Sequence, residues 1–229
     1  MSELALIVGA GPGLSAALAR AAAAAGMRVA LAARDAGKLG PLAAATGAKT
    51  YACDVARRDQ VAATFAAVER DLGVPDLAVF NASFRIRGPF ADLDPEGVAR
   101  TLQVSALGGF HVAQEAARRM LPRGSGSIFF TGASASVKGY AQSAPFAMGK
   151  FALRGLAQSM ARELAPKGIH VAHFVIDGGI RQDNDPRRER GPDGLLEPDA
   201  IAETYLHVHR QKRSAWTWEV ELRPWVETF

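Results

Sequence analysis

The feature that most constrains the fold of this chain is a regular alternation of two kinds of segment. Short apolar runs recur along the sequence, each followed by an amphipathic stretch of helical length. Such alternation is typical of βαβ units, in which parallel strands are buried on both faces and therefore read as continuous apolar runs. We predict strands at residues 4–8, 28–32, 49–52, 77–80, 127–131 and 169–174. The predicted fold class is α/β, a doubly wound parallel sheet with helices on both faces.

A seventh strand is predicted near the end of the chain, after a helix at residues 199–209. Bulky and polar residues alternate over residues 217–222, which is typical of an edge strand. The segment before this helix, residues 181–196, is rich in Asp, Arg, Pro and Gly and shows no periodicity. It is either a solvated loop or a mobile lid.

Length and composition favour one compact domain over residues 1–229. The chain has 229 residues, of which 48% are hydrophobic, enough for a sizeable core. Its single cysteine, Cys53, excludes an internal disulfide framework. The start of the chain shows no basic flank or cleavage-site pattern, and no apolar run approaches the ~20 residues that span a bilayer. We therefore expect a cytoplasmic protein with no membrane partner.

The charge pattern also limits the partners. The net charge is +4, but the arginines are scattered among acids rather than clustered, so we expect no nucleic-acid binding. The histidines at 170, 173, 207 and 209 have no cysteine or acidic pair at metal-ligand spacing. No metal site is expected. The partner is expected to be a small molecule whose identity the sequence does not reveal.

A glycine-rich turn directly follows the first predicted strand. Gly9, Gly11 and Gly13 lead into a helix that begins near Leu14. Glycines let a backbone turn tightly and approach a pyrophosphate, while a helix N-terminus offers free N–H groups and about half a positive charge. A turn without a ligand is the alternative. The strand–turn–helix order favours a Rossmann-type dinucleotide-binding site.

The glycine spacing, together with motifs further along the chain, resembles the short-chain dehydrogenase/reductase family. Val8 and Ser15 replace the threonine and the last glycine of the family's Thr-Gly-x-x-x-Gly-x-Gly pattern. The resemblance implies that Asp54 and Val55 contact adenine, although Asp54 could equally cap a helix. It also implies a cofactor role for Asn81 and Ala82, where a local turn is the alternative. Gly178 and Ile180 match the family segment that closes over the nicotinamide amide.

The end of the second predicted strand bears on the choice of nucleotide. Ala33-Arg34 stands there in place of an acidic residue that would bind the ribose of NAD. Arg34 can instead pair with a 2′-phosphate, so NADP is favoured and NAD remains possible. The alternative is that Arg34 and Asp35 only solvate a loop.

The resemblance implies a catalytic tyrosine four residues before Lys150, and the chain has Phe146 there. Lys150 is retained, and the i, i+4 spacing places it on the same helix face as Phe146. The family's serine position falls on Ala133, with Ser134 next to it, and Ser105 stands for the family's asparagine on the preceding long helix. The resemblance implies that Lys150 anchors the nicotinamide ribose, whereas the proton relay is altered at three positions.

Another proton source is then needed if a carbonyl is reduced. Tyr140, Ser134, Ser136 and Ser143 lie in the segment expected to cross the nicotinamide end, and Tyr140 is the best of them by its chemistry. A loop aromatic with no catalytic role is the alternative for Tyr140. Asp177 introduces a carboxylate near the same end, where it either orients a ligand or binds backbone N–H groups.

Two functions are consistent with these residues. The first is a divergent NAD(P)-dependent oxidoreductase of unknown substrate, and the second is a dinucleotide-binding protein without turnover. The resemblance also implies a homodimer or homotetramer formed by the helices that hold Ser105 and Lys150. The candidate catalytic residues are Lys150, Tyr140, Ser134 and Ser105. The candidate cofactor-binding residues are Gly9, Gly11, Gly13, Leu14, Arg34, Asp54, Val55, Asn81, Ala82, Lys150, Gly178 and Ile180.

Overall fold

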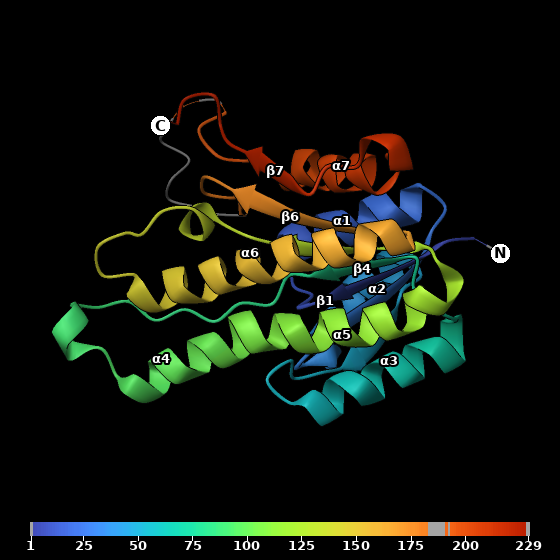
Figure 1. Ribbon diagram of the computed structural model, residues 1–229, viewed down its shortest axis with the longest axis horizontal. Helices are drawn as coiled ribbons and strands as arrows, with labels where there is room; N and C mark the ends of the chain where they lie inside the picture. Colours follow the sequence, from blue (N-terminus) through green and yellow to red (C-terminus); the bar gives the residue numbers. More distant parts are fainter. Residues whose placement is uncertain (1, 183–190, 192, 228–229) are drawn as a thin grey trace.

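The chain forms one seven-stranded sheet in which all neighbouring strands are parallel (Figure 1). The structure is a computed structural model that describes residues 2–182, 191 and 193–227. The strand order is β3-β2-β1-β4-β5-β6-β7, which is the doubly wound order that the sequence predicts. The strands are β1 Leu4–Val8, β2 Arg28–Ala33, β3 Lys49–Ala52, β4 Leu77–Phe80, β5 Gly126–Thr131, β6 Ile169–Ile176 and β7 Glu219–Leu222.

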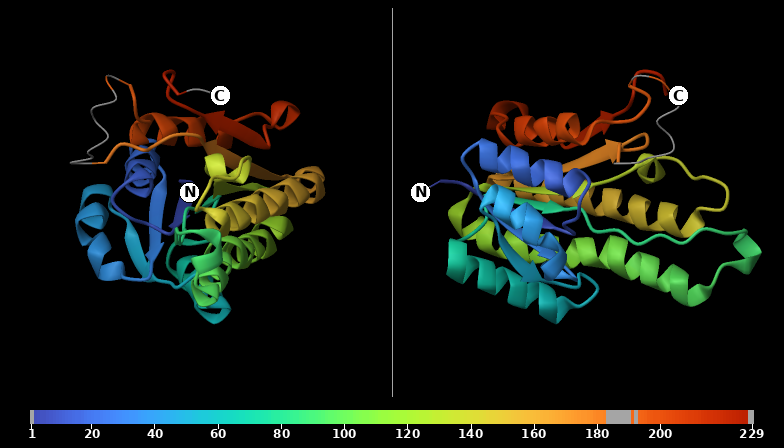
Figure 2. Two further views of the ribbon diagram at one scale, coloured as in Figure 1. Left: turned by 90° about the vertical axis from the view of Figure 1, so that its left-hand side faces the viewer. Right: turned by 180° about the vertical axis from the view of Figure 1, so that it is seen from behind.

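Helices cover both faces of the sheet, as expected for strands that are apolar throughout (Figures 1 and 2). Alternate residues of β1 show this division, because Leu4 and Leu6 pack with α3, α5 and α6 while Ala5 and Ile7 pack with α1 and α7. The helices are α1 Leu14–Ala24, α2 Gly40–Thr46, α3 Arg58–Leu72, α4 Pro95–Leu102, α5 Gly108–Met120, α6 Ala144–Leu164 and α7 Pro198–His209. No described helix is long and apolar enough to cross a membrane.

The seven predicted strands are all present, and the differences lie at their ends. β6 continues to Ile176, two residues beyond the prediction. β7 begins at Glu219 instead of residue 217, because the backbone of Thr217 is already engaged. Its N–H donates to Gln211 Oε1 at 2.9 Å, and its carbonyl lies 2.8 Å from His170 Nε2. As predicted, β7 lies at the edge of the sheet.

The loops that can hold a ligand leave the carboxyl ends of β1, β4, β5 and β6, on one edge of the sheet (Figure 1). Strand order reverses between β1 and β4, which is where doubly wound sheets bind ligands. Gly9 has a positive φ of 87°, and a Cβ there would lie 2.3 Å from the backbone nitrogen of Ala82. Only glycine therefore lets the two loops meet at this point.

The predicted loop at residues 181–196 is described only at its ends. Arg181 N–H donates to the Leu196 carbonyl at 2.8 Å, and Leu196 N–H donates to the Gly179 carbonyl at 2.9 Å. These bonds hold the two ends side by side. Residues 183–190 and 192, on which the choice between loop and lid depends, lie outside the described residues.

Candidate active site

The turn after β1 forms an open cradle at the N-terminus of α1. Gly13 is the N-cap, and no side chain caps the first N–H groups of the helix. A Cβ at Gly11 or Gly13 would meet no described atom within 4 Å, so the space above the turn is free. Uncapped N–H groups beside free space fit a phosphate group. Gly9, Gly11, Gly13 and Leu14 thus lie together as the sequence predicts.

Two side chains brace this cradle from behind. The buried hydroxyl of Ser15 donates to the Gly9 carbonyl at 3.1 Å and accepts from Asn81 Nδ2 at 2.6 Å. Ser15 occupies the place of the family's last glycine, and its hydroxyl supplies side-chain support of its own. Asn81 therefore links the loop after β4 to the cradle rather than serving a local turn.

The residues expected to face the adenosine half lie at the ends of β2 and β3. Arg34 directly follows β2, is exposed, and forms no ion pair or hydrogen bond with any described residue. Its neighbour Asp35 pairs with Lys38 at 3.5 Å. Asp54 Oδ1 accepts from the Ala56 N–H at 3.0 Å, which is a local turn and not a helix cap. Arg34 is thus available to an anion such as a 2′-phosphate.

Lys150 is on α6, and its side chain extends to the carboxyl end of β5, a central strand of the sheet. Its side chain is buried, 3% of the residue being exposed, and Nζ donates to the Thr131 carbonyl at the end of β5, at 2.7 Å. Burial lowers the pKa of the ammonium group to about 8. The ring centroid of Phe146 is 5.7 Å from Nζ, so the two share a helix face as predicted. A cation with a near-neutral pKa therefore lies beside an aromatic ring.

Three of the five candidate hydroxyl side chains, those of Ser105, Ser134 and Ser143, are bound to other groups or buried. Ser105 is fully buried in a π-helical turn, Gln103–Leu107, and its Oγ lies 3.4 Å from the Phe84 backbone nitrogen. Ser134 forms a side-chain hydrogen bond with Asp177. Ser143 is buried, and its Oγ has no hydrogen-bond partner among the described residues. None of the three forms a hydrogen bond with Lys150 in the described part of the chain.

Tyr140 packs against a side of α6 other than the one that carries Phe146 and Lys150. It lines a surface hollow of about 510 Å³ together with Met148 and Phe151. At about 100° per residue, Met148 lies about 160° around the helix from both Phe146 and Lys150, and Phe151 about 140° from Phe146 and about 100° from Lys150. The structure therefore does not bring Tyr140 to Lys150, and its position gives no support to the expectation that Tyr140 is the replacement proton donor.

A row of polar side chains lies beneath the segment after β5, and its hydrogen bonds could not be predicted from the sequence, although Ser136 is among the candidate hydroxyls. Ser136 Oγ accepts from the Ala133 N–H at 3.1 Å and lies 3.2 Å from His173 Nε2. His173 Nδ1 lies 3.2 Å from Glu219 Oε2, and Arg154 donates twice to Glu219, at 2.6 and 2.7 Å. The partners come from β6, β7 and α6, so no local sequence pattern could have revealed them.

The protonation of this row is set by its surroundings. Burial lowers the pKa of His173 to about 4, the Glu219 carboxylate opposing this shift and the Lys150 charge adding to it. A neutral imidazole next to a carboxylate holds its proton on Nδ1, so the Ser136 hydroxyl donates to Nε2. Ser136 and His173 are fully buried, and through the Ala133 N–H they position the backbone after β5.

The segment after β6 is tied to its neighbours by Asp177. This buried carboxylate lies 3.2 Å from Lys138 Nζ and 3.0 Å from an Arg223 nitrogen. Burial alone would raise its pKa, but hydrogen bonds from Ser134 and Lys138 and the nearby positive charges lower it. Asp177 therefore has a bracing role. Beyond it, a Cβ at Gly178 would lie 2.7 Å from Pro224 Cδ, and Ile180 forms a parallel bridge with Leu196.

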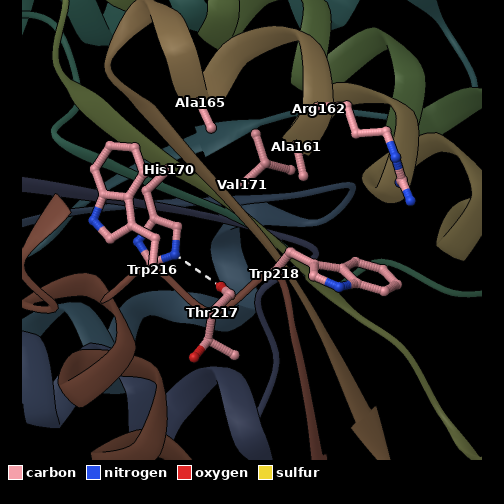
Figure 3. A pocket seen from close by; sticks show the side chains of 8 residues that line it. All are labelled: Ala161, Arg162, Ala165, His170, Val171, Trp216, Thr217 and Trp218. Carbon is pink, nitrogen blue, oxygen red and sulfur yellow. Dashed lines mark hydrogen bonds between the residues drawn. The ribbon is translucent and has the colours of Figure 1, made fainter. Parts of the chain in front are cut away.

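A separate cavity of about 300 Å³ lies near the amino end of β6 (Figure 3). Trp216 stacks on His170 with ring centroids 4.6 Å apart, and Trp218 forms another part of the wall. Since β6 runs from Ile169 to Ile176, residue 170 is at the end of the strand away from Lys150. This cavity is therefore distinct from the candidate active site. Among the described residues, no group of three His, Cys, Asp or Glu side chains could hold a metal ion.

The doubly wound sheet and the phosphate cradle together define a dinucleotide-binding protein of the Rossmann type, with a buried lysine near the carboxyl ends of its strands. The model of the short chain dehydrogenase family matches residues 3–188. The chain therefore belongs to the short-chain dehydrogenase/reductase family, as its resemblance implied.

Individual relatives agree with this assignment. The 3-oxoacyl-acyl-carrier-protein reductase MabA of Mycobacterium tuberculosis (strain ATCC 25618 / H37Rv) is 31% identical over 183 residues, 80% of this chain and 71% of the relative. The crystal structure of a short-chain dehydrogenase from Rhodopseudomonas palustris is 35% identical, with a TM-score of 0.84 over 97% of this chain and 99% of the other. A metagenomic short-chain oxidoreductase in complex with NADP is 28% identical, with a TM-score of 0.84 over 98% of each chain.

Proposed function

We propose that this protein is an NADP-dependent reductase of a small carbonyl compound that works without the family's tyrosine. The observation that carries the proposal is Lys150, a buried ammonium group with a pKa of about 8 at the edge of the sheet where the cofactor cradle lies. A group with this pKa is mostly protonated at pH 7 and can still release its proton. It is thus matched to the role of a general acid.

The residues present fit the cofactor. The uncapped turn at Gly11 and Gly13 would hold the pyrophosphate, Arg34 the 2′-phosphate, and Lys150 the ribose next to the nicotinamide. Bound NADPH would supply a hydride from C4 of its nicotinamide to the carbonyl carbon. Lys150 would give its proton to the carbonyl oxygen, which becomes a hydroxyl, and the neutral amine would regain a proton from water.

A second function is favoured by the same positions. Phe146 and Ala133 place no hydroxyl where the family resemblance implies a proton relay, and Ser105, at the position of the family's asparagine, is bound to the Phe84 backbone. A protein with this site could bind NADP(H) tightly and catalyse nothing, in a sensory or scaffolding role. Turnover distinguishes the two functions.

The experiment is a screen of carbonyl compounds followed by NADPH absorbance, with nucleotide binding measured in parallel. Turnover that is lost in Lys150→Met and kept in Tyr140→Phe supports the reductase with Lys150 as acid. Lys167→Met is the matched control, because Lys167 is exposed and pairs only with Glu163 among the described residues. Tight NADPH binding by the wild type with no turnover of any compound rejects the reductase in favour of the binding protein.

A further inference from the structure

The stretch at residues 84–88, between β4 and α4, is held close to the candidate active site at two points. At its start, the Phe84 backbone nitrogen lies 3.4 Å from Ser105 Oγ. Further along, the Gly88 N–H donates to the carbonyl of Gln142, just before α6, at 3.2 Å. Residues 85–87 are therefore held at both ends by these two hydrogen bonds.

Ile86 and the two arginines beside it differ in their exposure to solvent. Ile86 packs so closely on α4 that a Cβ at Gly97 would lie 2.8 Å from Ile86 Cδ1. Ile86 is half-buried, while Arg85 and Arg87 are exposed. Ile86 is thus the residue that packs on α4, and the two arginine side chains are accessible to solvent.

Arg85 reaches the ring that stands next to Lys150. Its guanidinium carbon lies 4.8 Å from the ring centroid of Phe146, in a cation–π contact. Lys150 Nζ lies 5.7 Å from the same centroid. The guanidinium and the ammonium are therefore no further apart than these two distances together, a span that a small organic molecule can bridge.

The positive charges along this stretch have no negative partner in the described part of the chain. The guanidinium groups of Arg85 and Arg87 form no ion pair or hydrogen bond with any described residue. Burial and the neighbouring Arg87 charge lower the pKa of Arg85. A third guanidinium, that of Arg100, lies 4.9 Å from the ring centroid of Phe84. Three such cations beside one site create a potential that attracts anions.

We propose that the substrate carries a carboxylate or phosphate group, which Arg85, held over Phe146, binds while the carbonyl group lies at Lys150. A guanidinium stacked on a ring keeps its edge N–H groups free, and these match the two oxygens of such an anion. This inference rests on the proposed reductase function, to which it adds the class of substrate. Phe146 then acts as the platform that orients Arg85.

The test measures binding rather than turnover. The protein is saturated with NADP⁺, which cannot reduce a carbonyl group, and titrated calorimetrically with matched pairs of charged and uncharged carbonyl compounds. The carboxylate pairs are pyruvate and pyruvamide, acetoacetate and acetoacetamide, and benzoylformate and benzoylformamide. Dihydroxyacetone phosphate and dihydroxyacetone form the phosphate pair. The variants are Arg85→Met, Arg85→Lys and, as a remote control, Arg210→Met on the exposed end of α7.

We expect at least one anion to bind about 10- to 100-fold more tightly than its uncharged counterpart. Arg85→Met should abolish this preference, Arg85→Lys should keep part of it, and Arg210→Met should keep all of it, with NADP⁺ affinity unchanged. No charge preference in any pair, or a preference that survives in Arg85→Met, overturns the inference. Turnover of neutral carbonyls alone would reject it while leaving the reductase intact, whereas Arg85-dependent anion binding without any turnover would reject only the reductase.

Discussion

The imidazole of His173 lies beneath Ser136, with Nε2 3.2 Å from the serine oxygen, and neither side chain is exposed. The pKa of His173 is lowered from 6.5 to about 4 by burial, so the unfolded chain binds this proton more readily than the folded one. Stability is then fully present above pH 6.5 and is lost as the pH falls towards 4. Between these limits we expect the free energy of unfolding to fall by on the order of 3 kcal/mol.

Denaturant unfolding between pH 7.5 and pH 4 measures this effect. His173→Gln should reduce the loss of stability on acidification, while His207→Gln, at an exposed position, should leave it unchanged. Part of the slope should remain, since burial also lowers the pKa of His170 and His209. Equal slopes in His173→Gln and the wild type would contradict the assignment.

The lowered pKa of Lys150 implies a pH dependence of the proposed carbonyl reduction. Its pKa of about 8 means that the acid form is lost as the pH rises through that value. The rate of carbonyl reduction at saturating NADPH should therefore fall about tenfold for each pH unit well above 8. A rate that stays constant up to pH 10 would show that Lys150 is not the proton donor.

Substitution of Phe146 by tyrosine tests what the ring contributes. Phe146→Tyr places a phenol beside the Lys150 ammonium and keeps an aromatic face under Arg85. We expect kcat for carbonyl reduction to rise, by up to about 10²-fold. Phe146→Leu, which removes the ring, should weaken binding of an anionic substrate without raising kcat. An inert Phe146→Tyr protein that still binds NADPH would mean that the site differs by more than one hydroxyl.

If Arg34 binds the 2′-phosphate, its substitution should change the preference for NADPH over NADH. Because its guanidinium is exposed and unpaired among the described residues, Arg34→Ala should weaken NADPH binding about 10- to 100-fold and leave NADH binding unchanged. Titration of nucleotide fluorescence measures both affinities, with Arg210→Ala as the control. Equal affinity of the wild type for NADPH and NADH would reject this role for Arg34.

Exposed apolar side chains on the outer faces of α5 and α6 lead us to expect that copies of the chain associate. Phe110 on α5 and Phe151 on α6 are 43% and 45% exposed, and the two helices lie side by side (Figure 1). Burial of such apolar side chains favours a homodimer or homotetramer. Light scattering at micromolar concentration should give a multiple of the chain mass, and Phe110→Glu with Phe151→Glu should reduce it. Phe90→Glu, at a distant tip, is the control, and a monomeric wild type would contradict the prediction.

Much of the fold was predictable because its signals are local. Most of the strands are apolar runs, and the glycine turn after β1 has a spacing that can be recognised without the structure. The start of β7 was harder to predict, because the backbone of Thr217 is hydrogen-bonded to the side chains of Gln211 and His170. Most of the candidate cofactor-binding residues come directly after strands, so their place at the carboxyl ends of the strands was predictable for the same reason.

The catalytic side of the site was harder to predict because its contacts join distant segments. Arg85 lies over Phe146 through a turn of chain that the sequence does not mark, and the bond between Ser136 and His173 joins β6 to the segment after β5. Tyr140 shows the opposite case. Its phenol and its place in the segment expected to cross the nicotinamide end suggested a catalytic role, but Tyr140 lines a hollow with Met148 and Phe151, on another side of α6 from Lys150.

The π-helical turn between α4 and α5, Gln103–Leu107, contains one residue more than an α-helical turn. Deletion of a single codon there would restore a regular helix and rotate α4 by about 100° relative to α5. Gly97 would then turn away from Ile86, and Arg85 would lose the packing that sets its direction. Such a deletion would alter the place that we propose for the anionic group of the substrate, while the sheet and the phosphate cradle would keep their positions.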